Sequence, residues 1–346
     1  MKRIAAVILT LATVLSVVLL SSCKKEEKQY SKSFIGVFDT QTVVVGCEMS
    51  EDIFNKNAEK IYELLEEYHR LFDIYHEYDG INNLKTVNSM AGKAPVKVDK
   101  AIIRLLKFSK EMYTLTDGMT NVAMGSVLSL WHDYRTKGLD DPKNAALPPM
   151  EELSKAALHT DIEKVIIDEK ESTVLLSDPE MRLDVGAVAK GYAVEMTARA
   201  FEEQGLSGYA LSVGGNVRCM GEKPSGDKWE IGVQNPDLTS DKAYIATAYF
   251  TNETLFTSGS YQRFYTVDEK QYHHIIDPET LMPKNTFAAV SVICDDSGEA
   301  DALSTALFNL TEKEGRRVAE KAGVHVAWVY PDGRVVMTEG FEKMTK

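Results

Sequence analysis

The chain has 346 residues, of which 44% are hydrophobic and 26% charged, a composition typical of a globular protein with a sizeable core. Its net charge of −13 argues against nucleic acid as a partner, because phosphate contacts require a basic face and no stripe of Lys and Arg is visible. The length allows one large domain or two ordinary ones, and no linker divides the main body of the chain.

Residues 1–22 are predicted to be a lipoprotein signal peptide. Two basic residues precede a nearly all-apolar stretch that ends in Leu20-Ser-Ser-Cys23. A short apolar stretch followed by small residues favours a cleavable signal over a permanent span. The L-S-S-C ending resembles a bacterial lipobox, in which the cysteine is diacylated. The alternatives are an uncleaved anchor or an ordinary signal with a chance cysteine. On the lipobox hypothesis, Cys23 anchors the protein to the extracytoplasmic face of the bacterial membrane through a polar tether at 23–33.

The first half of the remaining chain is predicted to be mainly helical. Residues 34–47 indicate a strand or a hairpin pair. Apolar side chains recur in steps of three and four over 52–72, which predicts an amphipathic helix. Asp99 can cap a second helix. A third helix is predicted over 121–132, a polar loop over 136–149, and strands at 165–167 and 174–176.

Strands dominate the second half of the chain. A helix is predicted to begin within 186–190 and to close at Gly205. The further predicted elements are strands at 209–213, 229–233, 243–251, 262–267 and 287–294, a helix over 301–322, and a hairpin that joins 326–330 to 335–338. Strands and helices do not alternate regularly. The pattern therefore predicts an α+β fold, in which mainly antiparallel sheets pack with helices in a single domain over 34–346.

Residues 183–192, LDVGAVAKGY, form the most informative stretch of the chain. Gly186 and Gly191 bracket Lys190 in a run of small and apolar residues at a predicted helix start. The free N–H groups of a first helical turn favour an anion, and a lysine adds a full positive charge. The stretch suggests a phosphate or pyrophosphate site, although it lacks the P-loop spacing. A small-residue helix packed tightly on a sheet is the alternative.

Other candidate site residues follow in the second half. Asp301 and Thr305 lie four apart in a predicted helix, and their hard oxygen atoms suit Mg²⁺ better than Zn²⁺. From spacing alone, an N-cap aspartate with a threonine bonded back to the helix is the alternative. Gly214 and Gly215 indicate either a close backbone approach to a ligand or an ordinary β-turn.

Two adjacent histidines and the cysteines complete the set. His273 and His274 precede Asp277-Pro278, which places them near a strand end. The polar neighbours of His132 predict a surface position.

The remaining cysteines, Cys47, Cys219 and Cys294, are predicted to be buried thiols, because each lies in or beside an apolar strand-like run. Their spacings fit no metal site, and their odd number argues against a disulfide framework, with a single disulfide pair as the alternative.

These stretches together resemble the ApbE family of FAD:protein FMN transferases. The resembling blocks, in the family's order, are 183–193, 212–216 (SVGGN), 229–236 (WEIGVQNP), 257–261 (TSGSY), 274–278 (HIIDP) and 300–307 (ADALSTAL). Residues 72–75 (FDIY) and 116–118 (TDG) fit the family's N-terminal half. The resemblance covers nearly all of residues 34–340, and blocks in the family's order are more specific than any one block.

The resemblance implies a role for each matched residue. It places a Mg²⁺ ion on Asp301, Thr305 and the backbone carbonyl of Ala187, with Lys190 on the pyrophosphate. His274 would either help to deprotonate an acceptor hydroxyl or hold the flavin phosphate, or its ring would only fix a loop. The other residues that it places at the flavin are Tyr75, Asp117, Met119, Asp184, Gly214, Gly215, Ser258, Gly259 and Ile276.

Three stretches depart from the family pattern. Phe38-Asp-Thr40 stands where the family usually has M-G-T, and Asp117-Gly-Met-Thr-Asn121 stands where the family commonly has D-G-A-F-D. Ser260 replaces the aspartate of T-S-G-D-Y. These departures affect the flavin contacts and leave Lys190 and the metal pair unchanged.

The implied activity is Mg²⁺-dependent transfer of FMN from FAD to a Thr or Ser hydroxyl of an exported acceptor flavoprotein, with release of AMP. A flavin-carrying subunit of a membrane electron-transfer complex would be such an acceptor. Two alternatives remain: an FAD pyrophosphatase that makes FMN and AMP, and a non-catalytic flavin-binding lipoprotein. The chain has no G-x-S-x-G elbow, no C-x-x-C and no H-E-x-x-H that would indicate another hydrolytic or redox chemistry.

Overall fold

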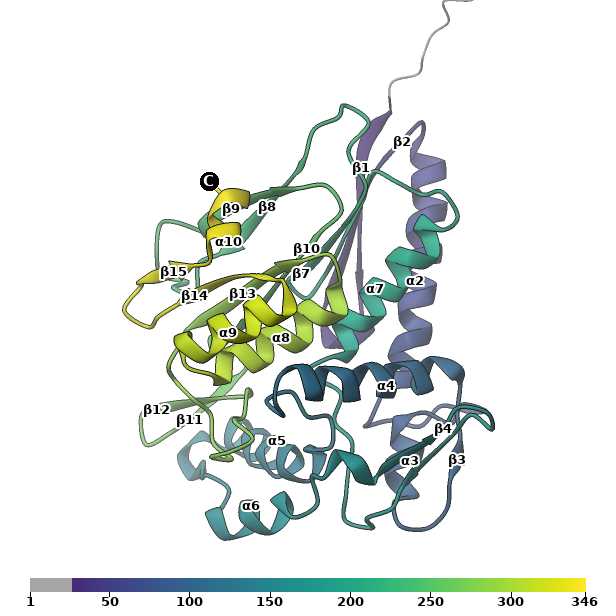
Figure 1. Ribbon diagram of the computed structural model, residues 1–346. Coiled ribbons are helices and arrows are strands. Elements are labelled where there is room, and N and C mark those ends of the chain that lie inside the picture. The colour runs from purple at the N-terminus through teal and green to yellow at the C-terminus, as the bar shows by residue number, and fades with distance from the viewer. Residues whose placement is uncertain (1–26) are drawn as a thin grey trace, which may run out of the picture.

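The computed structural model describes residues 27–346 (Figure 1). The predicted signal peptide, Cys23 and the first residues of the predicted tether lie outside the described residues. Within 27–346, no helix is both long enough and apolar enough to cross a membrane.

An eight-stranded antiparallel sheet organises the fold, in the order β1-β2-β6-β7-β10-β13-β14-β15. Its strands are β1 (Lys28–Ile35), β2 (Gln41–Glu48), β6 (Tyr209–Val213), β7 (Asn216–Met220), β10 (Thr254–Gly259), β13 (Ala289–Cys294), β14 (His325–Val329) and β15 (Val335–Met337). Both faces of the sheet are buried. Successive residues therefore enter different cores: Leu255 packs on one side and Phe256 on the other.

Helices cover one face of this sheet, and a strand pair covers the other. The helices are α2 (Glu51–Phe72), α7 (Ala189–Glu202), α8 (Ser297–Asn309) and α9 (Glu312–Ala322), which Figure 1 shows in front of and beside the sheet. The opposite face packs against β8 (Trp229–Gln234), β9 (Tyr244–Phe250) and α10 (Glu339–Met344). Helices α7 and α8 lie side by side, which brings two distant parts of the chain together.

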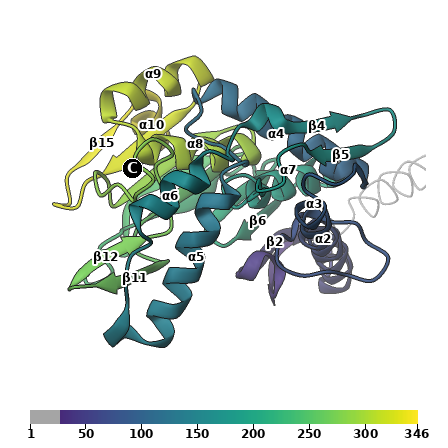
Figure 2. The ribbon, with the colours of Figure 1, turned by 90° about the horizontal axis from the view of Figure 1, so that it is seen from below.

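The remaining elements lie below the large sheet in the view of Figure 1. They are α3 (Leu84–Ser89), α4 (Lys100–Leu115), α5 (Gly125–Asp140), α6 (Met150–Ala157), the small sheet β3 (Val96–Lys97), β5 (Thr173–Leu176) and β4 (Val165–Asp168), and the hairpin of β11 (Phe264–Val267) and β12 (Lys270–His273). Short 3-10 helices lie at Val37–Asp39, Pro142–Asn144 and Ile162–Lys164. Figure 2 shows α5 beside the β11–β12 hairpin, against which Trp131 packs.

The predicted α+β class and the antiparallel character of the sheets are confirmed. Two helix boundaries were wrong. The helix predicted over 301–322 is two helices, because Thr311 and Glu314 form a capping box that starts α9. Helix α5 continues to Asp140 through part of the predicted loop. Gly205 closes α7 as predicted: its φ is 86°, its N–H donates to the Glu202 carbonyl at 2.9 Å, and the Leu206 N–H donates to the Phe201 carbonyl at 3.0 Å.

The first strand also begins earlier than predicted. Strand β1 starts at Lys28, inside the segment assigned to the tether. Its polar side chains alternate outward along a sheet edge, while Phe34 stacks on Tyr62 of α2 with ring centroids 4.3 Å apart. The Lys32 ammonium lies 2.8 Å from the Glu59 carboxylate of the same helix. The folded domain therefore begins near residue 28 and not at 34.

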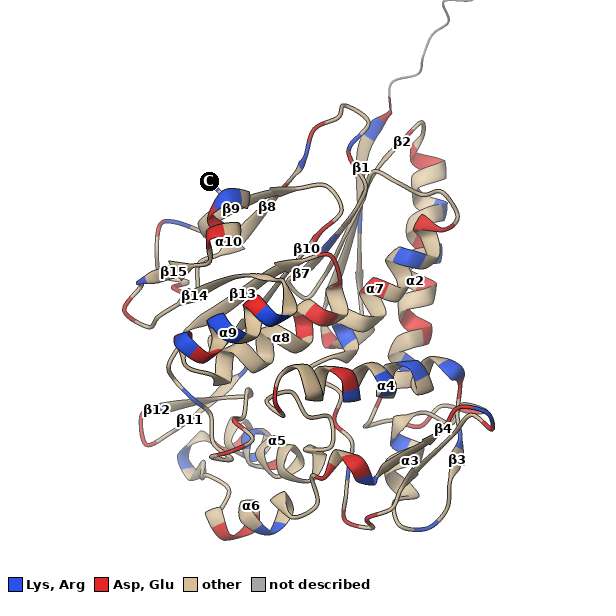
Figure 3. Ribbon diagram, viewed as in Figure 1, with Lys and Arg blue, Asp and Glu red and all other residues tan. Residues whose placement is uncertain are grey.

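Charged residues of both signs are interspersed along the surface helices (Figure 3). In that view, Lys and Arg segments alternate with Asp and Glu segments on α2, α4 and α9.

Candidate active site

Lys190 and Asp301 meet where α7 packs against α8. Gly191 permits this approach, because a Cβ atom there would overlap the Ser297 carbonyl and the Cβ of Asp301. The Gly191 N–H donates to Oδ2 of Asp301 at 2.7 Å. The Lys190 ammonium lies 3.8 Å from the centroid of the Phe256 ring on β10. Two predicted site residues from separate sequence blocks thus share one site.

Burial shifts the pKa values of both groups toward their neutral forms. It raises the pKa of the Asp301 carboxyl to about 6, although the Lys190 charge opposes the shift. It lowers the pKa of Lys190 to about 8, opposed by the Asp301 carboxylate. Each charge is poorly solvated, so the site favours a bound anion at Lys190 and a bound cation at Asp301.

The oxygen atoms around Asp301 fit a Mg²⁺ ion. Among the described hydrogen bonds, none engages Oδ1 of Asp301 or the Thr305 hydroxyl, which lies one turn further along α8. The N-cap of α8 is Asp296, so the N-cap alternative for Asp301 is wrong. The Gly191 N–H belongs to the first turn of α7, where N–H groups have no acceptor within the helix, and it binds Asp301.

Ala187 lies just before the N-cap of α7, and its carbonyl accepts no backbone hydrogen bond in the part of the chain that the structure describes. A carboxylate, a hydroxyl and a carbonyl are hard oxygen ligands of the kind that Mg²⁺ takes. Within residues 27–346, no group of three or more His, Cys, Asp or Glu side chains is arranged to hold a metal. The candidate ligands, which are Asp301, Thr305 and the Ala187 carbonyl, include only one such side chain. This number suits magnesium, because substrate phosphates and water usually complete its coordination.

The predicted Ser258–Gly259 block lies against the same helix. The Ser258 hydroxyl shares a hydrogen bond of 2.7 Å with the Ser304 hydroxyl, which also donates to the Asp301 carbonyl at 2.9 Å. Strand β10 thereby brings Phe256 to Lys190 and Ser258 to the helix that carries Asp301 and Thr305. Ser260, by contrast, bonds to the carbonyl of Ala288.

The two adjacent histidines have different surroundings. His273 is buried, and its ring bonds to the Lys284 carbonyl at 2.8 Å and accepts the Ile275 N–H at 3.2 Å. His274 is reached by solvent, and its only described side-chain hydrogen bond, to the Arg263 carbonyl, is 3.3 Å long. The loop-fixing role thus falls to His273, which leaves the His274 ring available to a substrate.

The His274 imidazole is neutral at physiological pH. Protein atoms crowd it although solvent reaches it, so burial is the first cause that lowers its pKa, to about 3. The charges of Arg263 and Arg135 lower the pKa further. A neutral imidazole can accept a proton from a hydroxyl. Ile276 is buried two residues on, and its carbonyl accepts a hydrogen bond from Asn309.

Tyr75 and Asp184 lie at the side of the site formed by α5. The Tyr75 ring is 5.3 Å from the His132 ring, and Arg135 contacts Nδ1 of His132 at 3.1 Å. Burial raises the pKa of Tyr75 to about 12, and the Asp184 carboxylate adds to the shift. Burial also raises the pKa of Asp184, although the Gly186 N–H donates to it at 2.9 Å.

Gly214 and Gly215 form the tight turn between β6 and β7. Their φ angles of 56° and 85° are those of a type I′ hairpin, for which glycine is preferred. A Cβ at Gly214 would lie 2.6 Å from Oγ1 of Thr40, so the turn packs on the 37–40 segment. Asp39, which stands at the family's usual glycine, has a left-handed φ of 53°. The structure thus supports the turn alternative for this pair.

Asp117 and Met119 are placed differently. The Asp117 carboxylate is exposed and lies 3.8 Å from Arg317 and 4.0 Å from Lys321, both on α9. Met119 is half-buried, and the next residue, Thr120, donates to the Ala302 carbonyl at 2.7 Å. The segment therefore packs on α8, but the described contacts of Asp117 do not include Lys190 or His274.

Sequence reasoning missed three residues near the site. His132 was predicted on the surface but is half-buried against Tyr75, and Arg135 and Arg263 were not singled out. No sequence block carries these residues. The packing of α5 beside β11 brings His132 and Arg135 to the site, and the register of the β11–β12 hairpin brings Arg263 to His274.

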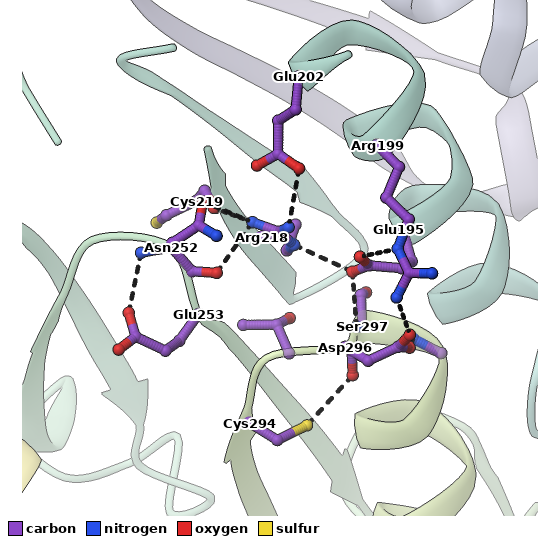
Figure 4. Close-up of polar contacts among 12 residues, drawn as sticks. Glu195, Arg199, Glu202, Arg218, Cys219, Asn252, Glu253, Cys294, Asp296 and Ser297 are labelled. Atoms are coloured by element: carbon purple, nitrogen blue, oxygen red, sulfur yellow. Dashed lines mark hydrogen bonds and ion pairs between the residues drawn. The ribbon is translucent and has the colours of Figure 1, made fainter. Parts of the chain in front are cut away.

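A buried ionic network behind the site was also missed (Figure 4). Glu195 of α7 accepts hydrogen bonds from Arg218 at 3.0 Å, from Arg199 at 2.8 Å and from the N–H of Ser297 at 2.9 Å. Arg199 also reaches the Asp296 cap at 2.7 Å. Because Ser297 is the first residue of α8, the network fixes the start of the helix that carries Asp301.

The three cysteines of the described chain, Cys47, Cys219 and Cys294, are free, as predicted. Of these, only Cys219 is fully buried.

We expect Glu195→Ala to destabilise the protein by about 3–5 kcal/mol, because it leaves the buried Arg218 without its main partner. Urea unfolding followed by circular dichroism measures the change. Glu66→Ala is the matched control: Glu66 pairs with Arg70 on the exposed face of α2 at 2.8 Å, and such surface pairs contribute up to about 1 kcal/mol. Equal unfolding midpoints for the two variants would contradict the bracing role of Glu195.

Comparisons of the sequence and of the structure with known proteins all lead to one family. The model of the ApbE family matches residues 39–328. The FAD:protein FMN transferase of Treponema pallidum (strain Nichols) is 31% identical over 319 residues, which cover 86% of this chain and 86% of the relative. That of Klebsiella pneumoniae (strain 342) is 27% identical over 287 residues, or 81% and 84% of the two chains. The crystal structure of the ApbE protein from Thermotoga maritima has a TM-score of 0.79 at 29% identity and covers 92% of this chain and 100% of that one.

Proposed function

Because this chain belongs to the ApbE family, we propose that it is an FAD:protein FMN transferase that moves FMN from FAD to a Thr or Ser hydroxyl of an acceptor flavoprotein and releases AMP. The observation that carries the proposal is the meeting of Lys190 with the Asp301–Thr305 pair, where α7 packs against α8. That site offers one position for an anion and one for a hard cation.

The reaction is a phosphoryl transfer. The acceptor oxygen forms a bond to the phosphorus on the FMN side of the pyrophosphate, the bond from that phosphorus to the bridging oxygen breaks, and AMP leaves with the bridging oxygen. When bound at Asp301, Thr305 and the Ala187 carbonyl, Mg²⁺ would neutralise the charge on the pyrophosphate oxygens. Lys190 binds the same oxygens, and its position over Phe256 holds the ammonium in place.

The acceptor proton goes to His274. Its neutral imidazole can take the proton as the new oxygen–phosphorus bond forms. His273 stabilises the loop through its bonds to Lys284 and Ile275, so His274 can face the substrate without a structural duty. Tyr75, half-exposed beside His132, offers an aromatic face for the flavin ring.

Incubation with FAD, Mg²⁺ and a purified acceptor domain tests the transferase. We expect an acceptor mass gain equal to one FMN minus water, together with AMP. AMP without an acceptor would instead indicate the pyrophosphatase. FAD binding without AMP under either condition would indicate a flavin-binding lipoprotein. An exported flavoprotein, such as a flavin-carrying subunit of a membrane electron-transfer complex, is the acceptor class that we propose.

The N-terminal sequence supports a location at the membrane. We propose that Cys23 is diacylated and that the enzyme acts on the extracytoplasmic face, because the apolar stretch before it ends in L-S-S-C.

We expect Cys23→Ala to prevent lipidation and to move the protein out of the membrane fraction, because two acyl chains provide most of the membrane affinity. Cell fractionation with immunoblotting, alongside metabolic labelling with a fatty acid, measures the change. Cys47→Ala, in the folded domain, is the matched control and should leave the labelling unchanged. A Cys23→Ala protein that stays wholly membrane-bound would rule out the lipid anchor.

A further inference from the structure

Arg263 and His274 lie opposite each other at the end of the β11–β12 hairpin. The register pairs Phe264 with His273, so one residue further it pairs Arg263 with His274. The His274 N–H donates to the Arg263 carbonyl at 3.1 Å, which confirms this pairing. Side chains of directly opposed residues in an antiparallel pair point to the same face of the hairpin, about 5 Å apart at Cβ. The Arg263 side chain therefore starts beside the imidazole.

A second guanidinium approaches from α5. Arg135 is half-buried and contacts His132, whose ring stacks near Tyr75. The positive charges of the two arginines repel each other, and both charges act to lower the pKa values of His274 and Tyr75. The charge of Arg263 also acts to lower the pKa of Lys190. The charge of Arg263 thus reaches both the pyrophosphate-binding lysine and the proton-accepting histidine.

Neither guanidinium has a carboxylate partner at ion-pairing distance among residues 27–346. The arginine ion pairs in this part of the chain involve Arg70, Arg199, Arg218, Arg316 and Arg317. The Asp184 carboxylate acts on Arg135 from beyond ion-pairing distance, and one of its oxygens accepts the Gly186 N–H. Two like charges, neither of them ion-paired with a carboxylate among residues 27–346, make a site that favours an anion.

We propose that Arg263, supported by Arg135, forms a second anion subsite that binds the phosphoryl group being transferred, on the side of the pyrophosphate opposite Lys190 and the metal pair. The attacked phosphorus must lie next to the acceptor oxygen, which in turn must lie next to His274, and Arg263 is the cation at that place. Charge on the phosphoryl oxygens would then be neutralised by Lys190 and by a metal ion held at Asp301 and Thr305 on one side, and by a guanidinium on the other. This subsite rests on the proposed function.

Direct binding of three probes tests the subsite. FMN carries the phosphate that would be transferred, riboflavin has the same ring without it, and AMP is the other product. Fluorescence or calorimetric titrations with Mg²⁺ would compare the wild type with Arg263→Ala and Arg263→Lys. Arg334→Ala is the matched control, because Arg334 stacks on Tyr330 at the distant β14–β15 turn.

We expect Arg263→Ala to weaken FMN binding by about 10-fold to 100-fold, the loss typical of a charge-assisted hydrogen bond, and to leave riboflavin and AMP binding near wild type. Arg263→Lys should recover part of the FMN affinity, and kcat for transfer should fall in the order wild type, Lys, Ala. Equal losses of FMN and riboflavin would overturn the proposal, because the arginine would then recognise the ring. Unchanged FMN binding with a raised KM for the acceptor would also overturn it, because the arginine would then bind an acidic acceptor segment.

The wild-type control separates this proposal from the proposed function. If the wild type transfers FMN while Arg263→Ala matches it in FMN affinity and kcat, only the subsite is wrong. If the wild type neither transfers FMN nor releases AMP, the proposed function fails whatever Arg263 does.

Discussion

Asp301→Ala is expected to lower FMN transfer by about a thousandfold or more. A metal ion contributes several kcal/mol of charge stabilisation, and about 1.4 kcal/mol corresponds to a factor of ten in rate. The variant loses the one carboxylate of the candidate metal set and also the acceptor of the Gly191 N–H at 2.7 Å. Excess chelator should abolish the activity of the unmodified enzyme in the same way.

Magnesium binding provides a readout that does not depend on turnover. Mg²⁺ should raise the melting temperature of the wild type and leave that of Asp301→Ala unchanged, because a ligand stabilises only a protein that binds it. Glu320→Ala, on the exposed side of α9, is the control and should respond as the wild type does. Full activity in excess chelator, or an undiminished Mg²⁺ response in Asp301→Ala, would remove the metal from the mechanism.

The raised pKa of Asp301 gives this prediction a pH signature. Metal binds the ionised carboxylate, so protons compete with Mg²⁺ as the pH falls through about 6. At limiting Mg²⁺, kcat/KM should therefore fall below about pH 6, and higher Mg²⁺ should move this limb to lower pH. The pKa of Lys190, lowered to about 8, affects the alkaline side of the pH profile. The ammonium loses its charge as the pH rises through about 8, and this loss should weaken FAD binding. An acidic limb that ignores Mg²⁺ would argue against Asp301 as the ligand.

His274→Ala is expected to slow FMN transfer by about 10²–10⁴-fold, the usual contribution of a general base, and to leave the FAD dissociation constant within a few-fold of wild type. The ring is accessible to solvent and has one weak hydrogen bond, so its removal should leave the fold intact. Activity should recover partly at high pH, where the acceptor hydroxyl ionises unaided. The wild type should show no limb at the usual histidine pKa, because that of His274 is lowered to about 3.

Lys190→Ala is the complementary variant. Its ammonium belongs to the binding of the pyrophosphate, so its removal should raise the FAD dissociation constant more than it slows the chemical step. Fluorescence titration with FAD, followed by transfer rates over a pH series, compares the two variants. If His274→Ala loses FAD binding while Lys190→Ala retains it, the histidine holds the flavin phosphate and the assignment of roles is reversed.

The sequence alone determined the features that depend on neighbouring residues. The apolar period predicted α2 almost to the residue, and Asp99 caps α4 as expected. Asp301 and Thr305 lie on one face of α8 because four residues make about one helical turn. The ordered motif blocks indicated the family, because each block is a contiguous stretch. Local patterns record the periodicity of burial and the chemistry of short segments, and both are written in consecutive residues.

Tertiary structure decided which of these segments meet. Gly191 lets α7 approach α8 so that its N–H bonds to Asp301, 110 residues away. The β11–β12 register set Arg263 opposite His274, and the packing of α5 added Arg135. The capping box at Thr311 divides the predicted 301–322 helix. Its residues are visible in the sequence, but the continuous helical pattern favoured a single helix. Contacts between distant segments depend on close packing and strand register, which no local period encodes.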